Sequence, residues 1–284
     1  MYSFEGIPQP EWVDRLQREY MMTGSNTERG EALIRQRMEE AVEKPGFSGN
    51  EEVRRILRMP VLSDPALIIA LEIASRKFIG EVDQFLYGRD CHPSDDVKLR
   101  GIEILAEYGL VFAVVTHAHE FVRRDPDEVA RLETMNPENL PENYIENRRA
   151  KLLDRRRKIE NAILDGIRVL VGEKPKPNGI AIRDSAQIID FIFTNTRFMS
   201  DELKLDIIEV LDRNGCHGPF GNLATYDLES LLIRETAKKV LEARGIPLDS
   251  LPRGLGSLGM IRVVDDEPKG KGVQPKEKGK SRLN

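Results

Sequence analysis

The sequence predicts an all-α protein, and three observations support that fold class. Apolar residues recur every three or four positions along most of the chain, which is the spacing of an amphipathic helix. Aromatic residues are only 6% of the 284 residues, so Leu, Ile, Val and Ala supply most of the core, a balance that suits helices. Clusters of Pro, Gly, Ser and Asn separate the helical segments.

The first third of the chain carries four helical patterns, over residues 11–20, 28–42, 50–58 and 66–86. Asn26 or Thr27 can cap the second helix, and Ser63 or Asp64 can cap the fourth. Ser48 lies three residues before a glutamate, which is a capping-box pattern for the third helix. Helix, turn, helix, turn and third helix together predict a small helix-turn-helix unit.

The middle of the chain predicts a helix at residues 95–108 and a long helix at residues 143–171. Between them, residues 110–123 either continue the first helix past Gly109 or form a separate one. Residues 125–141 are acidic and rich in Asn and Pro, so we expect a mobile connector there.

The C-terminal part predicts helices at residues 184–194, 200–211 and 227–243, with a polar turn at 214–222. Residues 251–260 are glycine-rich and irregular, and the lysine-rich segment 265–284 lacks apolar periodicity, which indicates a disordered basic tail. The expected regions are a helix-turn-helix-like region at 1–62, a central helical domain at 63–172, a helical bundle at 180–247 and the tail at 265–284.

The charge balance limits the classes of partner. The formal net charge is −5, which excludes a globally basic nucleic-acid binder but permits a basic patch on an acidic body. Two cysteines cannot form a disulfide framework, so a reducing compartment is expected. No apolar run approaches the length of a membrane span and no secretory signal is recognised, so we expect a soluble protein of the cytoplasm.

Two groups of basic residues are candidate nucleic-acid contacts. The first decorates the helix-turn-helix-like unit and comprises Arg29, Arg35, Arg37, Arg54, Arg55 and Arg58. Six glutamates in the same helices dilute their field, so ordinary solvated helix faces are the alternative.

The second group lies on what we expect to be the outer face of the long helix and comprises Arg148, Arg149, Lys151, Arg155, Arg156, Arg157 and Lys158. These residues suit a phosphate-contacting surface. On the same helix, Ile145, Leu152 and Ile159 are seven residues apart, which suits an oligomer contact. The alternative is a surface helix packed on its own domain.

Three segments of the first 110 residues, at 19–26, 43–67 and 95–110, resemble phage terminase small subunits. Gly46-Phe47-Ser48 is followed by Leu57-Arg58-Met59-Pro60-Val61, and the segment DDVKLRGIEILAEYGL, residues 95–110, is similar to a helix found downstream in that family. The resemblance implies that the protein recognises double-stranded viral DNA, forms a homo-oligomeric ring and acts in the host cytoplasm. It also implies a partner chain, the packaging ATPase, that carries the enzymatic activity.

No motif of this chain predicts catalysis or a cofactor. A phosphate-binding loop, a G-x-S-x-G turn and an H-E-x-x-H helix are all absent from the sequence. Cys91-His92 and Cys216-His217 together offer four potential zinc ligands, but adjacent residues seldom face one metal, so we expect no metal site. The sequence therefore predicts a non-enzymatic DNA-binding assembly protein. Its rivals are a viral nucleocapsid or other virion structural protein, and a helical enzyme with a site scattered along the chain.

Overall fold

The protein is all-α, as predicted, in a computed structural model that describes residues 10–24, 27–88, 93–135, 141–175, 177, 199–225 and 229–251. Every regular element in these residues is a helix. The expected helix at 184–194, the Cys91-His92 pair and the tail at 265–284 lie outside the described residues.

The first three helices begin close to the predicted positions. Helix α1 spans Glu11–Thr23, α2 spans Glu28–Glu43 and α3 spans Gly46–Leu57. Thr27 caps α2, because its side chain accepts a hydrogen bond from the Gly30 amide at 3.3 Å. Ser48, expected to start α3, lies inside it instead: Pro45 occupies the cap position, and the first turn of α3 packs on the end of α2.

Helix α4 spans Asp64–Tyr87 and packs against both α2 and α3. Its helical geometry breaks at Phe78, where φ is −125° and ψ is 50°. Ser63 precedes the helix, but its hydroxyl lies 2.9 Å from the hydroxyl of the buried Tyr20 and does not cap the helix. The boundary expected near residue 62 is therefore crossed by a continuous core.

Helix α5 spans Asp95–Glu107, and α6 and α7 form a long antiparallel hairpin beyond it. Helix α6 spans Val111–Thr134 and is separate from α5, while α7 spans Tyr144–Val171. The expectation of a connector over residues 125–141 is wrong for residues 125–134, which continue α6. The cause is tertiary: carboxylates in this stretch form ion pairs with α7, and Leu132 is buried.

Three further helices follow. Helix α9 spans Asp201–Arg213, α10 spans Phe220–Thr225 and α11 spans Leu231–Ala243, and a short 3-10 turn, η3, covers Leu248–Ser250. Serines at positions 200 and 230 cap α9 and α11. The polar turn expected at 214–222 contains the start of α10, because Phe220 is fully buried and anchors the chain there.

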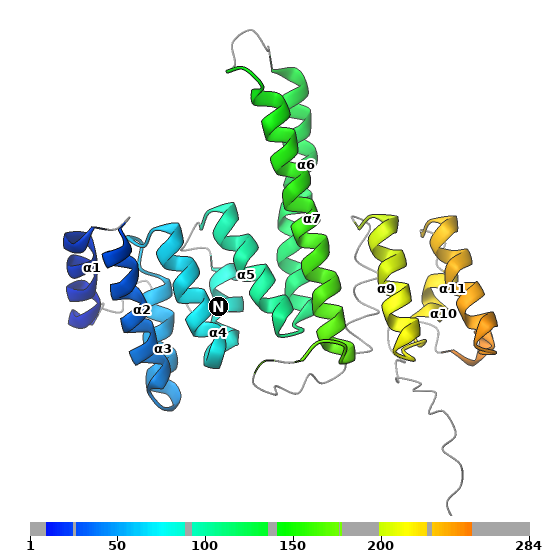
Figure 1. Cartoon of the computed structure of the whole chain (residues 1–284), viewed down its shortest axis with the longest axis horizontal. Coiled ribbons are helices and arrows are strands. Elements are labelled where there is room, and N and C mark those ends of the chain that lie inside the picture. Colours follow the sequence, from blue (N-terminus) through cyan, green and yellow to red (C-terminus); the bar gives the residue numbers. More distant parts are fainter. Residues whose placement is uncertain are drawn as a thin grey trace, which may run out of the picture.

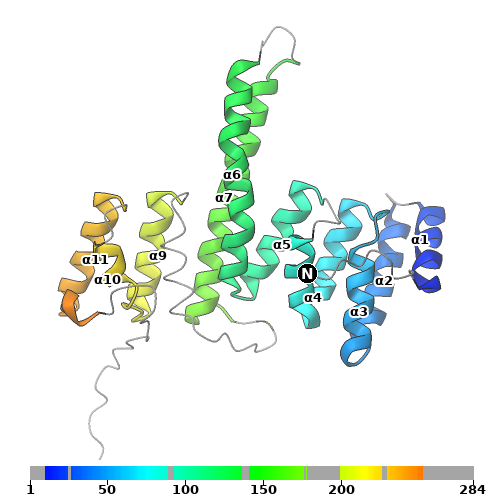
Figure 2. The same ribbon diagram turned by 180° about the vertical axis from the view of Figure 1, so that it is seen from behind.

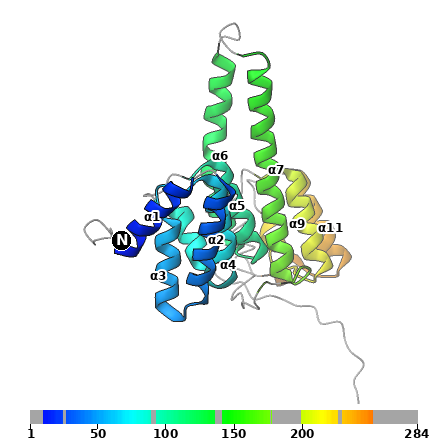
Figure 3. The same ribbon diagram turned by 60° about the vertical axis from the view of Figure 1, so that its left-hand side comes forward.

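The helices stand side by side in a row from α1 to α11, and the α6–α7 hairpin rises out of that row (Figures 1 and 2). With the end that bears α1 turned forward, both helices of the hairpin are seen to extend above the other helices (Figure 3). Helix α7 has 28 residues and α5 only 13, so α7 is roughly 20 Å longer at 1.5 Å per residue. This difference in length produces the projection.

Gly49 of α3 and Gly80 of α4 test the packing of the first helices. Alanine normally stabilises a helix relative to glycine by about 1 kcal/mol. A Cβ at Gly49, however, would lie 2.6 Å from the Lys44 carbonyl oxygen and 2.8 Å from that of Ala41, whereas a Cβ at Gly80 meets nothing within 4 Å. We expect Gly49→Ala to lower the free energy of unfolding by about 1–3 kcal/mol. Gly80→Ala should leave the free energy of unfolding unchanged or raise it. Urea denaturation of both variants measures this difference, and equal destabilisation by the two substitutions would contradict the prediction.

Candidate nucleic-acid interface

Arg155 of α7 is the centre of a buried ion-pair network at the base of the hairpin. Its side chain is 9% exposed, and it donates to Asp95 of α5 at 2.6 Å and to Asp125 of α6. Glu128 of α6 lies 3.4 Å away on the same guanidinium. Phe121 of α6 presents its ring to this guanidinium, with 5.1 Å between the guanidinium carbon and the ring centroid. One arginine therefore joins three helices.

The expectation that Arg155 lies on the outer face of the long helix is wrong. It follows Leu152 by three residues and precedes Ile159 by four, and both of these are buried, so helical geometry turns Arg155 inward with them. The arginine contributes to folding, and we remove it from the candidate interface.

The six other basic residues of the candidate group on α7 are exposed, and three of them have ion-pair partners. Arg148 pairs with Glu128 of α6, Arg156 with Glu160 at 3.4 Å, and Lys158 with Asp154 at 2.9 Å. The hydrogen bond to Asp154 raises the pKa of Lys158, which keeps that ammonium charged. The exposed residues with no carboxylate partner among the described residues are Arg149, Lys151 and Arg157.

The arginines of the helix-turn-helix-like unit are mostly engaged with carboxylates. Arg54 makes a bidentate contact with the buried Glu81 of α4, at 2.7 and 2.8 Å, and this contact raises the pKa of Arg54. Arg55 pairs with Glu51 at 2.7 Å, and Arg37 with Glu40 at 2.9 Å.

The other three arginines of this unit differ in exposure. Arg58 is half-buried at the end of α3, whereas Arg29 and Arg35 are exposed on α2 and meet no carboxylate among the described residues. These two are the cations of this unit that remain available to phosphate. The α7 set is larger and lies on a projecting element.

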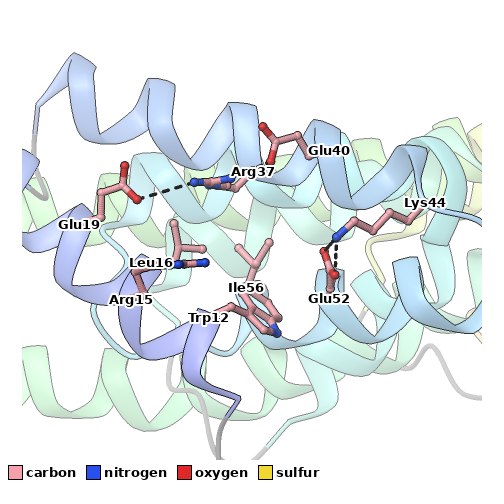
Figure 4. A pocket seen from close by; sticks show the side chains of 9 residues that line it. All are labelled: Trp12, Arg15, Leu16, Glu19, Arg37, Glu40, Lys44, Glu52 and Ile56. Atoms are coloured by element: carbon pink, nitrogen blue, oxygen red, sulfur yellow. Dashed lines mark hydrogen bonds and ion pairs between the residues drawn. The ribbon is translucent and has the colours of Figure 1, made fainter.

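Two surface cavities differ in charge. A groove of about 310 Å³ lies between α1, α2 and α3, with Trp12, Leu16 and Ile56 at its base (Figure 4). Its three cations and three carboxylates largely neutralise one another through the pairs Arg37–Glu19, Arg37–Glu40 and Lys44–Glu52. The groove therefore offers little net attraction to an anion.

The second cavity, of about 390 Å³, lies between α6 and α7 near the tip of the hairpin. Its lining combines arginines at positions 124, 131 and 148 with two carboxylates and three apolar or aromatic side chains. Sequence reasoning missed this site, because its residues come from two helices of which one was expected to be a loop. No local signal in the sequence points to it, because the pocket depends on the pairing of α6 with α7.

Two histidines form buried pairs with aspartates. His117 lies 2.8 Å from Asp83, and His217 lies 2.8 Å from Asp212, which Arg244 also contacts at 2.8 and 3.0 Å. Cys216 is adjacent to His217, but within the described parts of the chain no group of three or more His, Cys, Asp or Glu side chains is arranged to hold a metal.

Comparisons with protein-family models, with curated proteins and with solved structures find no match to this chain. None of the described helices is long and apolar enough to span a membrane.

Replacing Arg155 tests its role in the fold. Arg155→Ala leaves three carboxylates around an empty buried position, and breaking a fully buried pair costs about 3–5 kcal/mol. We expect Arg155→Ala to lower the free energy of unfolding by roughly 2–4 kcal/mol. The loss is smaller than for a fully buried pair because Asp95 is partly exposed and solvent screens it. Arg157→Ala, two residues further on, should change the unfolding free energy by less than about 0.5 kcal/mol. Equal effects of the two variants in urea denaturation would refute the central role of Arg155.

The Asp212 contacts predict a pH dependence. Hydrogen bonds from Arg244 and, secondarily, from His217 hold the pKa of Asp212 below its ordinary value. A carboxyl with a lowered folded-state pKa stabilises the protein above its unfolded pKa of about 3.9 and loses that contribution as the pH falls through the folded-state pKa.

We therefore expect wild type to be more stable than Asp212→Asn at pH 7, with the difference shrinking below about pH 4. Thermal unfolding from pH 7 to 3 measures this difference. The control is Asp206→Asn on the exposed face of α9, which should show no such trend.

Proposed function

We propose that the protein is a non-enzymatic DNA-binding assembly protein that contacts the phosphate backbone of double-stranded DNA through the α6–α7 hairpin. The observation that carries the proposal is the set of exposed cations on α7 without carboxylate partners in the described structure: Arg149, Lys151 and Arg157. Phosphate contacts by Lys and Arg supply most sequence-independent affinity for DNA.

The distribution of charge supports this orientation. Cations outnumber carboxylates seven to two over residues 144–158, although the whole chain has a net charge of −5. The acidic remainder of the protein is repelled by DNA, whereas the basic run of α7 is attracted and lies on a hairpin that projects from the row of helices (Figure 1). A contact through the hairpin brings the basic run of α7 to the DNA and keeps the acidic remainder of the protein away from it.

The specific form of this proposal is the small, DNA-recognising subunit of a phage packaging terminase. Its support is the resemblance over residues 46–48, 57–61 and 95–110. In this role the protein forms a homo-oligomer and delivers DNA to a packaging ATPase on another chain. Phe47, within the resembling segment, is 78% exposed at the start of α3, a position open to a partner molecule.

A titration of duplex DNA against salt tests the contact surface. The triple variant Arg149→Ala/Lys151→Ala/Arg157→Ala should weaken binding and reduce the slope of log K against log salt by about 3, since each phosphate contact contributes about 0.9. Fluorescence anisotropy with a labelled duplex at several salt concentrations measures both quantities.

Two control variants complete the experiment. Arg15→Ala/Lys239→Ala removes exposed cations far from the hairpin and should leave the slope nearly unchanged. Arg29→Ala/Arg35→Ala removes the available cations of α2. A larger loss of DNA affinity in this variant than in the triple variant would indicate that the helix-turn-helix-like unit makes the contact. Wild-type DNA binding that does not depend on salt would contradict the proposal. Binding to RNA that increases with its length, without preference for a duplex, would favour a virion structural protein.

A further inference from the structure

The pocket near the tip of the hairpin combines an aromatic face with a free cation. Tyr144, the first residue of α7, is 38% exposed, and Met135, just past the end of α6, is also 38% exposed. Leu132 forms the buried floor between them at 3% exposure. A flat apolar ring could therefore enter this space of about 390 Å³.

The charges of the lining are only partly neutralised. Glu128 is held by Arg148 and Arg155, and Arg124 reaches Asp95 at 3.0 Å. Arg131 has no carboxylate within ion-pair distance among the described residues, and the carboxylate of Asp127 likewise lacks a cation there. The pocket thus retains one positive and one negative group for a ligand.

We propose that this pocket holds one unpaired nucleotide of DNA, with its base stacked on Tyr144 and its phosphate paired with Arg131. The inference rests on the proposed function and deepens it, because it adds recognition of a strand end or an unpaired base to contact with the duplex backbone. Base stacking on an aromatic side chain and pairing of arginine with phosphate are the two interactions with which proteins bind single strands.

Asp127 adds a preference among bases. Its carboxylate accepts hydrogen bonds but cannot donate them, so it favours the amino group of adenine or cytosine over the carbonyl oxygen that thymine presents at the same place on its pairing edge. The same carboxylate disfavours an acidic peptide in this pocket. Lys151, two turns along α7 from Tyr144, links the pocket to the proposed backbone contacts.

The experiment compares a blunt duplex with the same duplex carrying a single unpaired adenosine nucleotide at its 3′ end. We expect wild type to bind the second about tenfold more tightly, as one stacked base contributes. Tyr144→Ala should abolish this gain while leaving the affinity for the blunt duplex unchanged, and Tyr144→Phe should retain it. With cytosine as the unpaired base, its replacement by thymine should reduce the gain in wild type but not in Asp127→Asn, because both bases are pyrimidines with similar stacking area.

A direct readout and a matched control complete the test. With 2-aminopurine as the unpaired base, its fluorescence should fall on binding to wild type and not on binding to Tyr144→Ala. Phe47→Ala removes an exposed aromatic side chain from α3, outside the pocket, and should keep the gain.

The outcomes separate this inference from the proposed function. Wild type that binds the blunt duplex but gains nothing from the unpaired nucleotide overturns the inference alone. A gain that survives in Tyr144→Ala also overturns it, as does a glutamate peptide that binds wild type but not Tyr144→Ala. A Tyr144-dependent capture of single strands without duplex binding supports the nucleotide pocket and rejects the duplex proposal.

Discussion

The hairpin depends on the position of one buried arginine. The apolar core that runs through the row of helices ends close to Phe121 on α6 and Ile159 on α7. Arg155 lies just beyond this end and draws carboxylates of α5 and α6 around its guanidinium. Further along, Leu132 and Leu152 are buried apolar side chains outside the main core. Charge pairing therefore joins the hairpin to α5 where the main core ends, and a smaller set of apolar contacts continues toward the tip.

This arrangement divides the basic residues into two groups with different roles. Arg155, Arg54 and Arg148 are used within the fold, because carboxylates of neighbouring helices hold them. The described structure gives no carboxylate partner to Arg149, Lys151 and Arg157 on the projecting helix, nor to Arg29 and Arg35 on α2. A count of arginines cannot separate these groups, since the separation depends on which acidic residues the fold brings within reach.

The fold was largely predictable from the sequence, and the contact surface only partly so. Apolar periodicity located α1, α2, α4, α5, α7, α9 and α11, and Thr27 marked the start of α2. The second half of α6 was missed because its helicity depends on ion pairs with α7, and local composition there favours a loop. Arg155 was misplaced for the same reason: a charged residue was assigned to solvent, although its helical position turns it toward buried neighbours. The Tyr144 pocket depends on the pairing of α6 with α7 and has no local signature.

The ion pairs around Arg155 and those nearer the tip of the hairpin differ in how strongly dissolved salt screens them. Mobile ions screen exposed charges over distances of about 8–10 Å at moderate ionic strength, and they screen enclosed pairs much less. The outer contacts, such as Arg148 with Glu128, weaken first as salt rises, while the enclosed contacts at the base persist. We therefore expect the hairpin to stay joined to α5 in concentrated salt, even where its outer ion pairs are screened.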